Sequence, residues 1–167
     1  MYIHRDIENL IKKYVKQGKI LIIYGARQVG KTTMLGELFP SDSDTLFLSC
    51  DERRVQEKLA PDSLALKQLF GNARLVILDE AHQVPEIGRV LKIAADHLKD
   101  MQIIATGSAA FELKNTLSEP LTGRHFAFTL SPLTFRELTQ GEPRVNDETR
   151  LQELMIYGSY PNVATVP

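Results

Sequence analysis

Short apolar runs alternate with amphipathic segments along most of the chain. Five runs are rich in aliphatic and β-branched residues and have the length of strands buried on both faces: residues 19–24, 44–51, 75–79, 102–106 and 124–132. Before and between them, apolar residues recur at helical spacing over about residues 6–16, 31–39, 52–70 and 86–99. Pro61 divides the third of these segments and is expected to begin a new helix rather than to kink one.

This alternation predicts an α/β fold, in which a mostly parallel sheet of five strands is covered by helices on both faces and connected by right-handed crossovers. In such a sheet, ligands bind at the carboxyl ends of the strands. Chemically active residues are therefore expected where each predicted strand ends.

A glycine-containing loop follows the first predicted strand. Its eight residues, Gly25 to Thr32 (GARQVGKT), fit the phosphate-binding pattern G-x-x-x-x-G-K-[ST]. Gly25 and Gly30 allow the backbone to curl so that successive N–H groups point inward, and the N-terminus of the next helix adds to the attraction for anions. Lys31 is positioned to reach the β- and γ-phosphates, and the Thr32 hydroxyl to bind Mg²⁺. The pattern predicts a nucleoside triphosphate held by Gly25, Ala26, Arg27, Gln28, Val29, Gly30, Lys31, Thr32 and Thr33.

Two adjacent carboxylates, Asp79 and Glu80, end the predicted strand at 75–79. At the carboxyl end of a parallel strand, Asp79 can hold Mg²⁺ through its water shell. Glu80, one residue further along, can turn toward the γ-phosphate and polarise an attacking water. Two acids in succession favour hydrolysis of the nucleotide over binding alone.

The predicted strand at 102–106 ends in small polar residues, among them Thr106 and Ser108. Either hydroxyl could contact the γ-phosphate or the attacking water and report hydrolysis. Both residues are equally consistent with capping a helix that starts near Ala109. Because the carboxyl ends of parallel strands meet at one edge, Gly25, Asp79 and Thr106 are expected to converge on one crevice.

Composition sets the size of the folding unit and excludes some partners. With 167 residues, 43% of them hydrophobic, the chain can bury one complete core, and residues 1–167 are expected to form a single domain. The net charge of −1 gives no overall attraction to nucleic acid or to an anionic membrane. The single Cys50 excludes an internal disulfide, and no segment of the sequence has the length and apolarity of a membrane span. A cytoplasmic location without membrane association is therefore expected.

Several motifs occur in an order that resembles a known family: GARQVGKTT, LDEAHQVPE, TGSAAFEL, LTGR, FTLSPLTFREL and YGSYP. They are similar to the AAA-type ATPase domain of a large group of bacterial and archaeal proteins, in which that domain precedes a C-terminal domain of unknown function. The resemblance covers nearly the whole chain. It implies an AAA-like P-loop NTPase with sheet order 5-1-4-3-2, and it implies ATP and Mg²⁺ as ligands. The preference for ATP over GTP rests on this family, since no guanine-reading NKxD-like segment is present.

The resemblance also implies a catalytic role for Arg124, the last residue of LTGR. In similar ATPases an arginine at this place can approach the γ-phosphate, within the same molecule or across a subunit boundary, and stabilise charge in the transition state. A surface arginine at the start of the fifth strand is an equally consistent interpretation. The side chain of Arg27, inside the phosphate loop, is expected to point toward solvent or a partner surface.

Similar proteins continue beyond YGSYP with a helical lid and a second domain, whereas this chain ends at Pro167. The helix predicted at about residues 147–155 is therefore expected to begin an incomplete lid within residues 147–167. Nucleotide binding should then be weaker than in an intact protein, and turnover slow, because adenine contacts and water exclusion often come from a lid. Self-association, or a protein or DNA partner, would act through the missing C-terminal region.

Together these residues predict an ATP-binding and Mg²⁺-dependent ATP-hydrolysing domain. Lys31, Glu80 and Arg124 are its candidate catalytic residues, and Thr32 and Asp79 its metal ligands. Two alternatives would use the same loop. A nucleotide-gated switch on DNA or protein would bind ATP with little turnover, whereas a small-molecule kinase would need a separate acceptor pocket.

Overall fold

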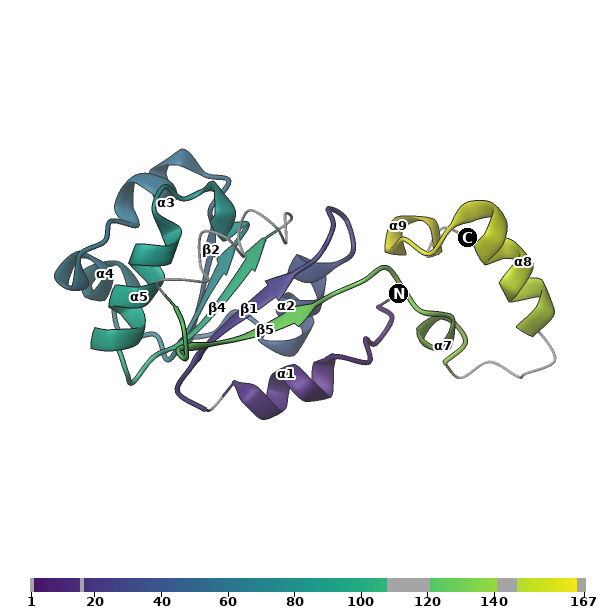
Figure 1. The fold of residues 1–167 in the computed structure, drawn as a ribbon, viewed down its shortest axis with the longest axis horizontal. Coiled ribbons are helices and arrows are strands. Elements are labelled where there is room, and N and C mark those ends of the chain that lie inside the picture. The colour runs from purple at the N-terminus through teal and green to yellow at the C-terminus, as the bar shows by residue number, and fades with distance from the viewer. Residues whose placement is uncertain (1, 16, 108–120, 141–146, 165–167) are drawn as a thin grey trace.

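The fold is an α/β arrangement in which one sheet lies between two layers of helices (Figure 1). The computed structural model describes residues 2–15, 17–107, 121–140 and 147–164. In chain order its elements are α1 (Glu8–Tyr14), β1 (Ile20–Tyr24), α2 (Lys31–Leu38), β2 (Thr45–Ser49), α3 (Arg53–Lys58), α4 (Ser63–Phe70), β3 (Leu75–Asp79), the 3-10 helix η1 (Ala81–Gln83), α5 (Ile87–His97), β4 (Gln102–Gly107), β5 (His125–Thr129), α7 (Phe135–Leu138), α8 (Asp147–Tyr157) and α9 (Pro161–Ala164).

The strands form one five-stranded sheet in the order β2-β3-β4-β1-β5, and every neighbouring pair is parallel. Counted from β5, the order is 5-1-4-3-2, which confirms the expected fold class and topology. Parallel pairing places the carboxyl ends of all the strands at one edge. In the register, Tyr24 lies beside Gly107, and Ser49 lies beside Asp79. The carboxyl ends of β1, β3 and β4 therefore meet at this edge.

Helices cover both faces of the sheet (Figure 1). The side chains of β1 point alternately to the two faces, and on each face they pack in a hydrophobic cluster with helices. Ile20, Ile22 and Tyr24 belong to the cluster built with α3, α4 and α5. Leu21 and Ile23 belong to the cluster on the other face, which is built with α1 and α2. No residue of β1 is more than 6% exposed. This central strand therefore holds the loop that follows it in a fixed place.

The predicted strands and helices of the described residues are confirmed, several of them with shorter boundaries. The second strand covers 45–49 rather than 44–51, and the first helix covers 8–14 rather than 6–16. The segment 52–70 forms the two helices α3 and α4, and Asp62 caps α4 by accepting a hydrogen bond from the Ala65 N–H at 2.7 Å. The prediction that Pro61 precedes a new helix is thus confirmed. The helix expected near Ala109 lies outside the described residues.

Hydrophobic periodicity did not predict the short elements η1, α7 and α9. α7 begins with a capping box, in which the Thr134 hydroxyl accepts from the Glu137 N–H and the Glu137 carboxylate accepts from the Thr134 N–H. The helix predicted at 147–155 is α8, which extends to Tyr157. Four of its large apolar side chains are exposed, namely Leu151, Met155, Ile156 and Tyr157. No helix in the described part of the chain is long and apolar enough to cross a membrane.

Two leucines of α4 test how the core is built. Leu66 is fully buried, whereas Leu64 in the same helix is 64% exposed. We expect Leu66→Ala to lower the free energy of unfolding by about 2–5 kcal/mol, because it removes buried methyl groups and leaves a cavity. Leu64→Ala should change that free energy by less than about 0.5 kcal/mol. Urea denaturation measures both values, and equal losses would contradict the assigned core.

Candidate nucleotide-binding site

The glycine-containing loop leaves β1 and turns sharply into α2. A Cβ atom on Gly25 would lie 2.4 Å from the Leu130 carbonyl oxygen and 3.0 Å from Val29 Cγ2, so only glycine fits there. Gln28 and Gly30 both have left-handed backbone conformations, with φ of 64° and 93°. Gly30 is also the N-cap of α2. The loop therefore has the curled form that directs backbone N–H groups toward an anion.

Burial of the predicted loop residues divides them into two groups. Ala26, Arg27, Gln28, Thr32 and Thr33 are exposed, whereas Gly25, Val29 and Lys31 are buried. The exposed Arg27 agrees with the expectation that its side chain points away from the core. The buried members carry the contacts that fix the loop.

The Lys31 side chain, only 3% exposed, lies inside the loop. Its Nζ donates hydrogen bonds to the carbonyl oxygens of Gly25 and Ala26, both at 3.1 Å. The same Nζ is 3.6 Å from Glu80 Oε1. The ammonium group therefore joins the start of the loop to the acid that follows β3, and the structure brings these two predicted residues together.

Asp79 is held by one hydroxyl on each of its carboxylate oxygens. Thr32 Oγ1 donates to Asp79 Oδ2 at 2.7 Å, and Thr106 Oγ1 donates to Asp79 Oδ1 at 2.6 Å. The Thr106 hydroxyl also accepts a hydrogen bond from the Glu80 N–H at 2.9 Å. Thr106, which is fully buried in β4, therefore orients the Asp79 carboxylate and the backbone of Glu80. Ser108 lies outside the described residues.

Glu80 has a left-handed backbone, with φ of 51°, which costs a residue with a side chain about 1–3 kcal/mol. This turn directs its carboxylate back toward the loop. Oε1 faces Lys31, and Oε2 is 3.2 Å from His82 Nδ1 in η1. Both side chains are mostly buried, with 18% of Glu80 and 15% of His82 exposed. Nothing in the sequence pattern indicated that His82 would pair with Glu80.

The oxygen atoms at this edge suit a hard divalent cation. The Thr32 hydroxyl and the Asp79 carboxylate lie within hydrogen-bond distance of each other, at the point where α2 begins and β3 ends. Mg²⁺ typically binds one or two oxygen ligands from the protein and completes its coordination with water and phosphate oxygens. These residues fit the predicted metal.

Arg124 is not brought to this site, which corrects the expected catalytic role within one molecule. Its carbonyl accepts from the Ile20 N–H at 3.0 Å, so it lies at the amino end of the sheet. The loop begins at the opposite end of β1, about 16 Å away at the usual rise per strand residue. The Arg124 Nε donates to Asp96 Oδ1 at 2.8 Å, and this hydrogen bond holds the pKa of Asp96 below its ordinary value. The exposed position agrees with the alternative of a surface arginine.

A further set of residues behind the loop was not found from the sequence. The guanidinium of Arg5 donates to the Val29 carbonyl oxygen at 2.8 Å and pairs with Glu137. The T-x-x-E pattern at Thr134 was a readable sign of the capping box that places Glu137. Nothing in the pattern around Arg5 indicated that its side chain would be buried against the loop.

Fold and site together define the class of P-loop nucleoside triphosphatases. The parallel sheet has the required order, the loop lies between β1 and α2, and an acid at the end of β3 meets the first residues of α2. Residues 17–139 match the protein family described as "AAA domain". This match covers well over half of the chain, and the chain belongs to that family.

The chain is similar to curated proteins over most of its own length. The chain is 27% identical to an uncharacterized protein of Methanocaldococcus jannaschii over 96% of its own length and 36% of the relative's. It is 30% identical to an uncharacterized protein of Mycobacterium tuberculosis over 80% of its own length and 30% of the relative's. The chain thus spans about a third of the length of these relatives.

Two solved structures share the fold. A Walker-type ATPase of Pyrococcus abyssi matches 96% of this chain and 65% of its own, with a TM-score of 0.64 and 17% identity. The ORC1 protein of Aeropyrum pernix, solved in complex with DNA, matches 92% of this chain and 50% of its own, with a TM-score of 0.58 and 16% identity. At these identities the likeness concerns the fold alone.

Two glycines test the packing of the loop. We expect Gly25→Ala to destabilise the protein by at least about 1–3 kcal/mol, because the new methyl group would overlap the Leu130 backbone. Gly36, within α2, has nothing within 4 Å of the place that a methyl group would take. Gly36→Ala should therefore stabilise the protein by about 0.5–1 kcal/mol through helix propensity. Thermal unfolding of both variants measures these changes, and a tolerated Gly25→Ala would contradict the close approach of the backbone that follows β5.

Cys50 follows β2 at the same edge and is fully buried. Burial, with the negative charges of Asp79, Asp51 and Glu80, raises the pKa of its thiol to about 12. The reactive thiolate is therefore a very small fraction of the thiol at about pH 8. We expect iodoacetamide to leave Cys50 unmodified in the folded protein and to alkylate it readily in urea. Mass spectrometry measures the adduct, and rapid alkylation without urea would contradict the burial.

Proposed function

We propose that the protein binds ATP and hydrolyses it in a Mg²⁺-dependent reaction at the edge where β1, β3 and β4 end. The observation that carries this proposal is the 3.6 Å approach of Lys31 Nζ to Glu80 Oε1, beside an Asp79 that is held by Thr32 and Thr106. In this proposal Lys31 binds the phosphates, Glu80 acts on the attacking water and Asp79 serves the metal, and contacts between neighbouring side chains bring the three together.

Binding of the triphosphate falls to the loop and the lysine. The N–H groups between Gly25 and Thr33 form the concave surface for the phosphates, and the N-terminus of α2 adds positive potential. Lys31 exchanges its hydrogen bonds with the Gly25 and Ala26 carbonyl oxygens for the β- and γ-phosphate oxygens. The nucleotide is ATP because of the family to which the chain belongs.

Metal binding falls to Thr32 and Asp79. Mg²⁺ held there would neutralise charge on the phosphate oxygens. Thr106 keeps one Asp79 oxygen in place through its 2.6 Å hydrogen bond, and the other oxygen, which accepts the Thr32 hydrogen bond, would be the one available to Mg²⁺ and its water shell. Thr106 therefore acts as a positioning residue for the metal ligand.

Glu80 orients the attacking water and accepts its proton. The water oxygen forms a bond to the γ-phosphorus, the bond from that phosphorus to the bridging oxygen breaks, and ADP leaves. Once Lys31 turns to the phosphates, the Glu80 carboxylate is released from its ion pair and becomes available to the water. The hydrogen bond from the Glu80 N–H to Thr106 keeps the backbone of this base fixed.

Three predicted features stay part of the proposal in a narrower form. Arg124 can act only from a neighbouring copy of the protein, because it lies at the far end of its own sheet. Ser108 stays a candidate contact of the γ-phosphate. The segment 147–164 stays a candidate beginning of a lid. The relatives are about three times longer than this chain. The process that hydrolysis drives would therefore depend on a protein or DNA partner that binds outside these 167 residues.

Phosphate release tests the role of Glu80. We expect Glu80→Gln to lower release at least about 10²-fold while ATP still binds, because the amide cannot accept the proton of water. Glu86→Gln is the matched control, since Glu86 lies in the segment that joins η1 to α5, is 63% exposed and pairs with the exposed Arg89. Chelation of Mg²⁺ should abolish release by the unchanged protein.

The same assay separates the alternatives. Equal release by the unchanged protein and by Glu80→Gln would end the hydrolase assignment and leave a nucleotide-gated switch. Transfer of the γ-phosphate to added metabolites, with little free phosphate, would favour a small-molecule kinase.

A further inference from the structure

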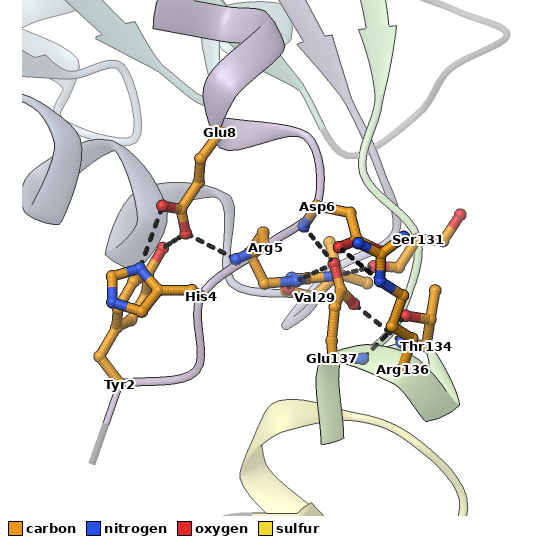
Figure 2. A network of polar contacts seen from close by, with 10 residues as sticks. All are labelled: Tyr2, His4, Arg5, Asp6, Glu8, Val29, Ser131, Thr134, Arg136 and Glu137. Carbon is orange, nitrogen blue, oxygen red and sulfur yellow. Dashed lines mark hydrogen bonds and ion pairs between the residues drawn. The ribbon is translucent and has the colours of Figure 1, made fainter. Parts of the chain in front are cut away.

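Arg5 is a buried arginine that precedes α1 and reaches the back of the phosphate loop (Figure 2). Its side chain is only 4% exposed. Nη1 donates to the Val29 carbonyl oxygen at 2.8 Å, and Nη2 donates to the Ser131 carbonyl oxygen at 2.6 Å. Arg5 lies outside residues 17–139, the part that matches the family. Its contact with the loop is therefore a feature of this chain's structure rather than of the matched segment.

Glu137 neutralises and fixes the guanidinium. Its Oε1 is 3.2 Å from Arg5 Nε and accepts from the Asp6 N–H at 2.8 Å, and its Oε2 accepts from the Thr134 N–H at 2.8 Å. Burial raises the pKa of Glu137, but these hydrogen bonds and the Arg5 charge outweigh burial and lower it. The carboxylate is therefore ionised, and with both partners 4% exposed the pair is rigidly held.

The backbone of Arg5 is fixed as firmly as its side chain. Its N–H donates to Glu8 Oε1 at 2.6 Å, and the Tyr2 hydroxyl donates to the same oxygen at 2.8 Å. Figure 2 shows these contacts on one side of Arg5 and the Val29, Ser131 and Glu137 contacts on the other. Arg5 is thus held both at its backbone and at its guanidinium. This fixes the direction of its hydrogen bond to the Val29 carbonyl oxygen.

The contact with Val29 determines where the next amide points. Val29 and Gly30 share one planar trans peptide unit, in which the carbonyl oxygen and the N–H point in opposite directions. Gly30 has φ of 93° and no Cβ, so its own conformation restrains this unit weakly. With the Val29 carbonyl oxygen bonded to Arg5 behind the loop, the Gly30 N–H is directed to the opposite, inner side.

Arg5 also ties the two ends of the loop to one strand. The Leu130 N–H donates to the Tyr24 carbonyl oxygen at 2.7 Å, and the Leu130 carbonyl oxygen lies against Gly25. The next residue, Ser131, accepts from Arg5. The backbone leaving β5 therefore supports the start of the loop directly and its end through the guanidinium.

We propose that Arg5 is a positioning residue for nucleotide binding, which aims the Gly30 N–H at a phosphate of the bound nucleoside triphosphate. This inference rests on the proposed function. Arginine supplies a separate nitrogen to each carbonyl oxygen, Nη1 to Val29 and Nη2 to Ser131. A lysine could keep the charge near Glu137, but it would replace this planar fork with a single nitrogen on a flexible side chain. Loss of one charge-assisted hydrogen bond corresponds to an affinity change of about tenfold or more.

The test compares Arg5→Lys with Arg136→Lys. Arg136 is an 84% exposed arginine in the same network, where it pairs with Asp6 on the outer side. ATP affinity is measured by calorimetry at a temperature where both variants are fully folded by circular dichroism. We expect Arg5→Lys to bind ATP about tenfold or more weakly and Arg136→Lys to bind it as the unchanged protein does.

A second readout separates positioning from general stability. In ¹⁵N-labelled protein, the Gly30 amide signal should shift on addition of ATP, and this shift should be lost or reduced in Arg5→Lys. Glu137→Gln, which removes the charge that holds the guanidinium, should show a weaker effect in the same direction, and it takes the place of Arg5→Lys if that variant does not fold.

The outcomes distinguish this inference from the function on which it rests. If the unchanged protein does not bind ATP, both the proposed function and the role of Arg5 are overturned. If it binds ATP and the Arg5 and Glu137 variants bind it with about the same affinity and an unchanged Gly30 shift, only the role of Arg5 is overturned.

Discussion

The arrangement at the carboxyl edge of the sheet depends on the Asp79 carboxylate, which is hydrogen-bonded to two other elements. Asp79 accepts a hydroxyl hydrogen bond from Thr32 at the start of α2 and another from Thr106 near the end of β4. The loop helix, the acidic strand and the neighbouring strand are therefore joined at a single buried group. Because a buried carboxylate is stable only when its oxygens are satisfied, any displacement of one element is felt by the other two.

Much of this arrangement could be predicted because it follows from strand direction. Apolar runs with polar residues at their ends specify parallel strands, and parallel strands bring Lys31, Asp79 and Thr106 to one edge whatever the detailed packing. The order of the strands is different. Nothing in the periodicity distinguishes β4 from β3 as the neighbour of β1, and the order came from the resemblance to a family.

The remaining features depend on contacts between distant parts of the chain. Arg5 lies in a polar segment whose pattern is that of a surface, and its burial follows from Glu137, which lies far away in the sequence. The left-handed Glu80 could not be predicted either, since acidic residues rarely adopt this conformation without a reason from the surrounding structure. Arg124 shows the opposite case, because its expected role within one molecule required a position at the carboxyl end of the sheet, whereas the parallel pairing of β1 and β5 puts it at the amino end.

The close contact between Gly25 and Leu130 has a consequence for how the protein matures on the ribosome. The loop is made early, but the backbone that shapes both its ends, at Leu130 and Ser131, follows β5, the strand that pairs directly with β1. A nascent chain that has emerged only as far as β4 therefore has the motif without its support. The loop therefore takes its supported shape only after β5 has docked against β1 and the residues that follow β5 have closed around the loop.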